Sequence, residues 1–109
     1  MGVTRTHLFS TIQNEIATIS KVLGHPARIA ILEHLMTTKG CICGDLVSEI
    51  GLAQATISQH LKELKRIGII KGQIDGTSVC YCIDVERWKE IQNQMMNYFQ
   101  QGLDKSTCC

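Results

Sequence analysis

Six cysteines stand in close pairs along this chain of 109 residues, and their thiols are its most conspicuous chemical groups. The three pairs are Cys41 with Cys43, Cys80 with Cys82, and Cys108 with Cys109. A disulfide within such a pair would close almost no loop and would add little stability. Thiolates held close together bind soft metal ions well. The spacing therefore predicts metal-binding or redox-active thiols rather than a disulfide framework.

The chain carries no sign of export to an oxidising compartment. Its first ten residues contain no apolar segment of the kind that directs secretion. No apolar run approaches the roughly 18 residues that a membrane span requires. We therefore expect a cytoplasmic protein with reduced thiols and no membrane partner.

Apolar residues spaced three and four apart predict helices at both ends of the chain. One stripe covers residues 8–23 and is ended by Gly24. Pro26 suits the first turn of a second helix that runs to about Met36. A further stripe predicts a last helix over residues 85–101.

The middle of the chain has the pattern of a helix-turn-helix over about residues 45–67. A short helix ends near Ile50, and after a tight turn a longer helix begins at Gln54. A hairpin of two strands is predicted over about residues 69–83, with Asp75-Gly76 at its turn. The 109 residues thus predict one mainly α domain with a small β-hairpin, a winged helix-turn-helix.

The longer helix and the strand after it form the one strongly basic stretch. Residues 54–72 carry four cations against one acid, a net charge of +3, in a chain whose net charge is +1. If Ile57, Leu61 and Leu64 face the core, the opposite face begins with small polar groups and ends with cations. A helix in the major groove of DNA needs this gradient, because short polar groups reach base edges and cations reach phosphates. The predicted DNA contacts are Gln54, Thr56, Ser58, Gln59, His60, Lys62, Lys65, Arg66 and Lys71.

Three segments add a recognisable pattern: residues 25–32 read HPARIAIL, residues 54–61 read QATISQHL, and Gly76-Thr77 precedes Val79-Cys80-Tyr81. In this order and spacing they resemble the ArsR/SmtB family of bacterial winged-helix metalloregulators, over residues 12 to about 99. The resemblance implies a homodimer built on the first and last helices. It also implies that the dimer binds a twofold-symmetric double-stranded operator without a cofactor and releases it when an inducer binds.

The resemblance also implies where an inducer binds. The arsenic-sensing branch carries a Cys-x-Cys-Asp-Leu segment entering the helix-turn-helix, and residues 41–46 here read CICGDL, with one additional glycine. A helix N-terminus stabilises thiolates, the form that binds soft metals. Trivalent arsenic or antimony takes three thiolates, so the loop pair needs a third ligand from the C-terminal pair, in the same or the other subunit. The candidate ligands are Cys41, Cys43, Cys108 and Cys109, with Cys80 and Cys82 ranked behind them.

Other inducers and other functions remain open at this point. Cadmium and lead are soft enough for thiolates, whereas nickel and cobalt prefer imidazole and carboxylate ligands, and the four histidines are scattered. A repressor of the same fold could instead respond to thiol oxidation or persulfide formation. A thiol metal carrier or enzyme is the remote alternative, because no nucleophile has a positioned base. We therefore expect no enzyme; the sequence leaves the operator and the target genes undefined.

Overall fold

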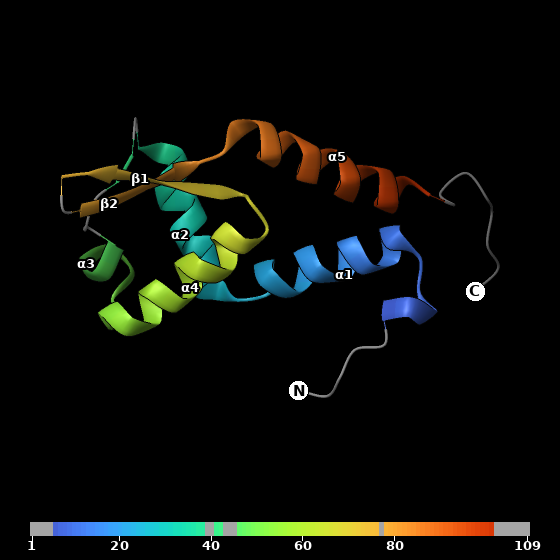
Figure 1. Ribbon diagram of the computed structural model, residues 1–109, viewed down its shortest axis with the longest axis horizontal. Coiled ribbons are helices and arrows are strands. Elements are labelled where there is room, and N and C mark those ends of the chain that lie inside the picture. Colours follow the sequence, from blue (N-terminus) through green and yellow to red (C-terminus); the bar gives the residue numbers. More distant parts are fainter. Residues whose placement is uncertain (1–5, 39–40, 43–45, 77, 102–109) are drawn as a thin grey trace.

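The computed structural model describes residues 6–38, 41–42, 46–76 and 78–101. It is mainly helical with one two-stranded hairpin, which confirms the predicted winged helix-turn-helix class (Figure 1). The elements are a short 3₁₀ helix at Thr6–Leu8, α1 Thr11–Leu23, α2 Pro26–Thr37, α3 Leu46–Ile50, α4 Gln54–Arg66, β1 Ile70–Asp75, β2 Ser78–Ile83 and α5 Val85–Gln100.

The first helix begins later than the apolar stripe predicts. The Ser10 hydroxyl accepts from the backbone N–H of Gln13 at 3.0 Å, and the Gln13 side-chain oxygen accepts from the Ser10 N–H at 2.9 Å. This capping box satisfies N–H groups that would otherwise be unpaired, so the helix starts at Thr11. The prediction of a helix from Leu8 is therefore wrong, and Leu8 lies in the preceding 3₁₀ turn.

The core lies where α1, α2 and α4 meet. Apolar residues at helical spacing turn inward from each of these helices, and Ile70 of β1 joins them among the least exposed side chains. The three core positions predicted on α4 are all buried. The largest fully buried side chains are Ile19, Ile31, Ile57, Leu64 and Ile70. Burial of one side of α4 therefore fixes which side chains it presents to solvent.

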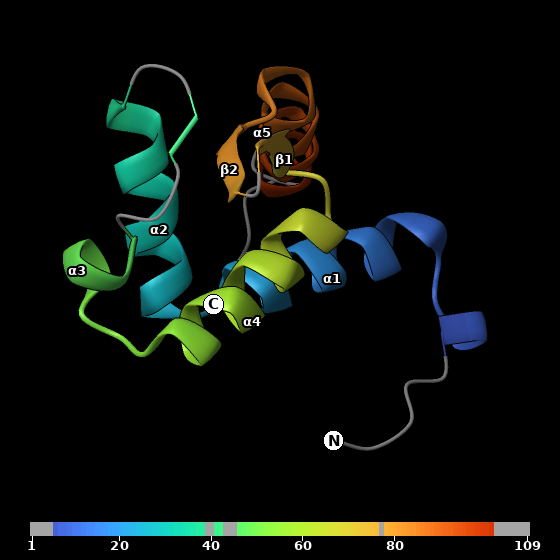
Figure 2. The same ribbon diagram turned by 60° about the vertical axis from the view of Figure 1, so that its left-hand side comes forward.

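The hairpin packs above α4, and Figure 2 shows α4 low in the molecule with the hairpin above it and α3 beside α2. β1 and β2 pair antiparallel from Ile70 opposite Ile83 to Asp75 opposite Ser78. Gly76 has a φ of 64°, which suits a tight hairpin turn. On its other side, β2 forms an isolated antiparallel bridge with the loop before α3, between Ile42 and Tyr81.

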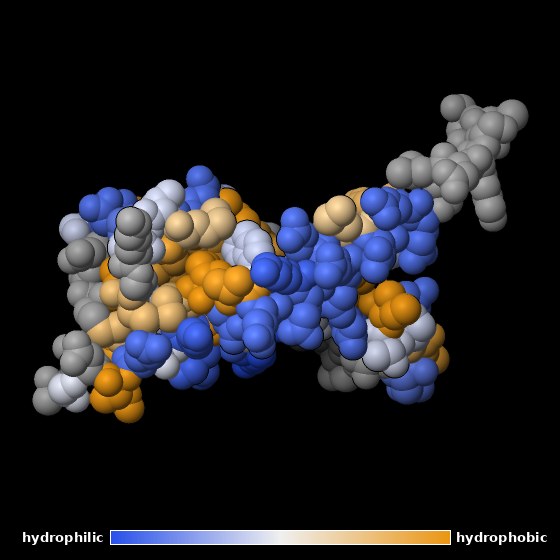
Figure 3. Space-filling view, turned by 90° about the horizontal axis from the view of Figure 1, so that it is seen from above, coloured by the Kyte–Doolittle hydropathy of each residue, from blue (hydrophilic) through white to orange (hydrophobic). Residues whose placement is uncertain are grey.

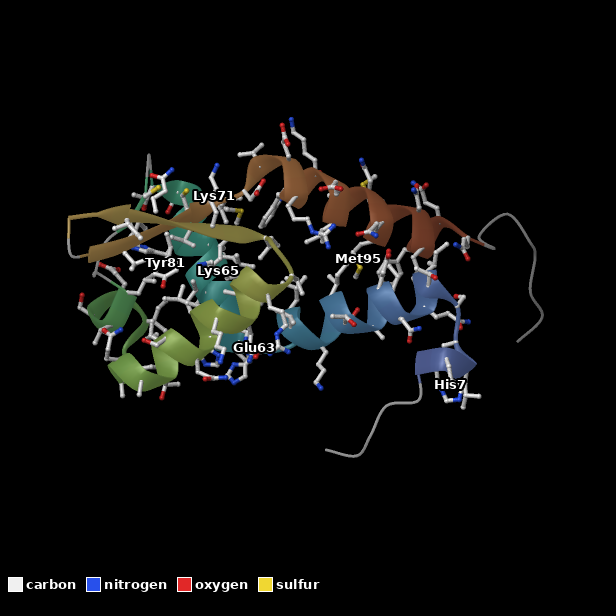
Figure 4. The ribbon with its side chains drawn as sticks, in the orientation of Figure 1. His7, Glu63, Lys65, Lys71, Tyr81 and Met95 are labelled. Atoms are coloured by element: carbon white, nitrogen blue, oxygen red, sulfur yellow. The ribbon has the colours of Figure 1, made fainter. Side chains whose placement is uncertain are left out.

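At the end away from the hairpin, α1 and α5 run side by side (Figure 1). The Gln94 side-chain amide donates to a carboxylate oxygen of Glu15 at 2.7 Å. Met95 points from α5 toward α1 (Figure 4). This end also exposes large apolar side chains, namely Leu8, Phe9, Ile12, Met96, Tyr98 and Phe99. Among the described residues, no helix is both long and apolar enough to cross a membrane.

Candidate DNA-binding face and thiol pair

The outer face of α4 presents most of the predicted DNA contacts to solvent. Gly51, with a φ of 83°, makes the turn between α3 and α4, and α4 is then held by its buried side. At its N-terminal end, the Gln54 amide donates to the Ser58 hydroxyl at 3.1 Å. The exposed members of the predicted set are Gln54, Thr56, Ser58, Gln59, Lys62, Lys65, Arg66 and Lys71.

His60 is the exception, because it faces the interior with only 6% of its surface exposed. Its Nδ1 accepts a hydrogen bond from Nε of Arg28 at 3.0 Å, and its ring lies 4.4 Å from that of His25. Burial lowers the pKa of His60, and the nearby His25 and Arg28 lower it further. The prediction that His60 contacts DNA is therefore wrong; the side chain ties α4 to the start of α2.

The cations of this region do not all share one surface. A Cβ added to Gly72 would lie 3.7 Å from Nζ of Lys65, which places the Lys65 ammonium between α4 and the hairpin. Figure 4 shows Tyr81 on this same side of the hairpin, whereas Lys71 points away on the opposite side. A guanidinium nitrogen of Arg66 and a carboxylate oxygen of Glu63 lie 3.6 Å apart on α4, in a pair in which Arg66 is exposed and Glu63 is partly buried. The structure thus brings Lys65 beside the hairpin of β1 and β2, which is the wing of the fold, but separates Lys71 from the α4 cations.

The bridge between Ile42 and Tyr81 brings together two thiols that we call the thiol pair, Cys41 and Cys82. The backbone N–H of Ile42 donates to the Tyr81 oxygen at 2.8 Å, and the reverse hydrogen bond is 2.9 Å long. In this register Cys41 lies opposite Cys82 at a position without backbone hydrogen bonds, where side chains approach most closely. Cys41 also donates to the Gln73 side-chain oxygen at 3.3 Å.

Both members of the thiol pair carry free thiols and are partly buried. Burial raises the pKa of Cys82, and its hydrogen bond with Cys41 raises it further, against an opposing effect of Lys71. The Cys82 thiol is therefore protonated near neutral pH. A ligand that binds here must displace that proton.

Of the remaining cysteines, Cys80 is the one that lies within the described residues. Cys80 is 3% exposed and disulfide-bonded, so the expectation that every thiol is reduced is wrong for this residue. The bond is not to Cys82, whose thiol is free. The predicted ligands Cys43, Cys108 and Cys109 lie outside the described residues. Within the described part of the chain, no group of three or more His, Cys, Asp or Glu side chains could hold a metal.

Sequence reasoning did not predict that Cys82 meets Cys41. One signal was available: the loop and β2 both read Cys-x-Cys, a spacing that puts two thiols on one face of an extended strand. Two such segments present matching faces when they pair. Their pairing, however, depends on a single bridge that no local pattern predicts.

Comparison with known proteins agrees with the helix-turn-helix fold. A family model described as a helix-turn-helix domain matches residues 23–73. An uncharacterized helix-turn-helix transcriptional regulator of Methanocaldococcus jannaschii is 42% identical over 77 residues, which cover 69% of this chain and 84% of that protein. The arsenical resistance operon repressor of Staphylococcus xylosus is 30% identical over 90 residues, 83% of this chain and 78% of the relative.

Among solved structures, the homodimeric winged helix-turn-helix DNA-binding domain of a possible ArsR-family regulator from Mycobacterium bovis superposes with a TM-score of 0.64. The match covers 100% of this chain and 98% of that one at 18% identity, so it speaks for the fold alone.

Proposed function

The chain belongs to the ArsR/SmtB family of DNA-binding helix-turn-helix transcriptional regulators rather than to any enzyme family, and we propose that it is a repressor whose operator is released when trivalent arsenic or antimony binds its thiols. The thiol pair is the observation that carries this proposal. It joins the loop that precedes α3 to the wing, the two parts that flank the helix-turn-helix in the sequence.

The outer face of α4 supports direct contact with operator DNA. Gln59 is exposed in the first half of the helix, where its amide is suited to pair with adenine in the major groove. Lys62 and Arg66 follow toward the C-terminal end and suit phosphate contacts, which position the protein without reading sequence. Lys65 adds a cation between α4 and the wing.

A ligand on the thiol pair acts on this face through the backbone. Cys41 is followed by α3, and α3 packs against α4, so a shift of the loop toward the wing changes how α4 is presented. Soft metals and metalloids favour thiolate ligands. The pair supplies two sulfur ligands, and Cys43, Cys108 and Cys109 are the candidates for the third that inorganic arsenic requires.

The experiment is fluorescence anisotropy of the protein on its own upstream DNA, titrated with arsenite. A phosphine keeps the thiols reduced, because a dithiol reductant would itself bind arsenic. We expect release of the wild type at stoichiometric arsenite. Cys41→Ser and Cys43→Ser should each bind DNA normally and fail to release it. Normal release by both variants would rule out the loop as part of the inducer site.

Homodimerisation through α1 and α5 is part of the proposal. Ile12 is 60% exposed and Phe99 65% exposed. Exposing large apolar side chains to water is unfavourable, and a second subunit that covers them would remove this exposure. Ile12→Asp should lower the apparent mass in light scattering from dimer to monomer and weaken DNA binding. Val85→Asp, which changes an exposed apolar residue at the other end of α5, is the matched control and should remain dimeric.

A second signal is favoured by one observation, the disulfide at Cys80. A chain in which one cysteine is cross-linked beside a free thiol pair suits a repressor that responds to thiol oxidation. The anisotropy experiment separates the two signals. Release after mild oxidation but not with arsenite would make this a redox-sensing repressor, and the absence of DNA binding would overturn both versions.

A further inference from the structure

The thiol pair opens into an apolar cavity of about 510 Å³, which lies within the size range of ligand pockets, roughly 300–1,000 Å³. Viewed from above, apolar side chains gather where α2, the hairpin and the first turn of α5 meet, beside the hydrophilic outer face of α5 (Figure 3). Apart from the two thiols, the lining consists of Leu35, Met36, Thr38, Ile83, Val85 and Trp88.

The apolar surroundings continue beyond this cavity. A neighbouring cavity of about 320 Å³ between α2 and α5 shares Met36 and Trp88 with it. The one hydroxyl group in the lining of the larger cavity, on Thr38, already donates to the carbonyl oxygen of His34 at 2.9 Å. A ligand on the thiol pair therefore meets mainly apolar side chains on the cavity side, and the polar group beside it is the Gln73 side-chain oxygen, 3.3 Å from Cys41 Sγ.

These surroundings discriminate among arsenic compounds. Inorganic arsenite bound by two thiols keeps one hydroxyl group, and that group gains nothing from burial against apolar side chains. A trivalent arsenical with one organic substituent keeps a carbon group instead, and burial of that group is favourable.

We propose that Cys41 and Cys82 bind a trivalent arsenical that carries one organic substituent, with the substituent seated in the apolar cavity. In the reaction, R–As(OH)₂ and two cysteine thiols give R–As(S–Cys)₂ and two water molecules. Two As–O bonds break and two As–S bonds form, each thiol proton leaves with a hydroxyl group, and arsenic stays trivalent. This inference rests on the proposed function and names the chemical class of its inducer.

The test uses phenylarsine oxide and the reduced full chain, with a phosphine as reductant. Trp88, the one tryptophan of the sequence, lines the cavity and serves as a fluorescent reporter. We expect its emission to change and to saturate at one phenylarsine per subunit. Cys41→Ser and Cys82→Ser should each weaken binding about a hundredfold or more, because each removes the chelate effect of two linked bonds.

Cys43→Ser is the matched control, because it removes a thiol from the same loop without touching the pair, and it should bind phenylarsine oxide like the wild type. Arsenite should bind the thiol pair more weakly than phenylarsine oxide, so a higher concentration of arsenite should be needed to change the Trp88 emission. As a check that does not depend on variants folding, bound phenylarsine should protect Cys41 and Cys82 from alkylation. Equal binding of arsenite, or a Cys43→Ser defect as large as that of Cys82→Ser, would overturn the inference.

This inference and the proposed function fail in different ways. If phenylarsine oxide binds Cys41→Ser and Cys82→Ser as tightly as the wild type while arsenite still releases DNA from the wild type, the organoarsenical site is wrong and the repressor survives. If phenylarsine oxide binds the thiol pair but neither arsenical releases DNA, the site stands and the inducible repressor is wrong.

Discussion

The outer face of α4 and the thiol pair both offer reactive side chains to a ligand, but they are assembled in different ways. Every side chain on the α4 face comes from one helix of 13 residues whose inner side is fixed by the core. The thiol pair instead joins a loop to a strand far along the chain through the two backbone hydrogen bonds between Ile42 and Tyr81. A continuous face loses affinity in steps as residues are removed, whereas a two-residue site is lost with either residue.

The two regions nevertheless share one strand. Successive residues of β2 point to opposite faces of the hairpin, so Tyr81 faces α4 and Lys65 while Cys82 faces the cavity. This alternation lets one strand contribute to both sites without mixing their chemistry. Substitutions on the two faces should therefore have separable effects, and substitutions in the shared core should not.

The largest effect is expected from a substitution in the core, because the outer face of α4 and the thiol pair both depend on its packing. Leu64 is completely buried on α4, and Leu64→Ala removes apolar contacts and leaves a cavity. We expect a loss of about 2–5 kcal/mol in the free energy of unfolding, measured by urea denaturation. Thr56→Ala on the exposed side of the same helix should change it by no more than about 0.5 kcal/mol. Similar losses in the two variants would contradict the assigned inner and outer sides of α4.

Gln59→Ala should produce the next largest effect and should act on the DNA face alone. An amide paired with adenine contributes about 1–3 kcal/mol of discrimination against other bases, so the variant should bind a mutated operator nearly as well as the native one. Lys62→Ala is the comparison, because a phosphate contact weakens binding to all sequences and lowers the salt slope by about 1. Anisotropy titrations at several salt concentrations measure both. Unchanged discrimination in Gln59→Ala would remove this residue from base contact.

A smaller effect, on folding stability, is expected when low pH protonates His60, the side chain that links α4 to α2. The pKa of His60 lies below its ordinary value of 6.5, mainly because of burial, so the unfolded chain binds a proton more readily than the folded one. The stabilising contribution of neutral His60 is complete above pH 6.5 and is lost as the pH falls toward the lowered pKa. Protonation would also put a hydrogen on Nδ1, where Arg28 now donates.

Thermal unfolding between about pH 7.5 and 5 measures this contribution. The wild type should lose thermal stability over this range more steeply than His60→Gln, whose amide oxygen can still accept from Arg28. His34→Gln, near the other end of α2, should follow the wild type. A parallel pH dependence in His60→Gln would show that acid acts elsewhere.

The sequence predicts the α4 face and the thiol pair to different extents because the two regions are built differently. The inner and outer sides of α4 were predictable because Ile57, Leu61 and Leu64 recur at helical spacing, and one buried stripe fixes the whole helix. His60 was misplaced because it lies at the edge of that stripe. Its burial depends on partners from another helix, Arg28 and His25, which no periodicity on α4 reveals.

The sequence did not predict the thiol pair, for a related reason. The sequence showed two Cys-x-Cys segments, but the meeting of Cys41 with Cys82 depends on a bridge formed outside any regular element. The cavity beneath the pair likewise requires α2, β2 and α5 to be placed in space. The start of α1 was predicted too early. The apolar stripe begins before Ser10, but the Ser10 capping box starts the helix at Thr11.

The smallest expected effect is the sharpest test of the separation between the two faces of β2. Without an arsenical present, Cys82→Ser should leave both DNA affinity and its salt dependence unchanged, because the side chain faces the cavity and not α4. Gly72→Ala is the matched change on the opposite face, where the new Cβ would lie 3.3 Å from Val79 Cγ1 and 3.5 Å from Tyr81 Cε1. Crowding there, beside the Lys65 ammonium, should weaken DNA binding several-fold in the same anisotropy assay. If Cys82→Ser weakened DNA binding as much as Gly72→Ala, the two faces would be coupled before any inducer binds, and α4 and the thiol pair would have to be treated as one site.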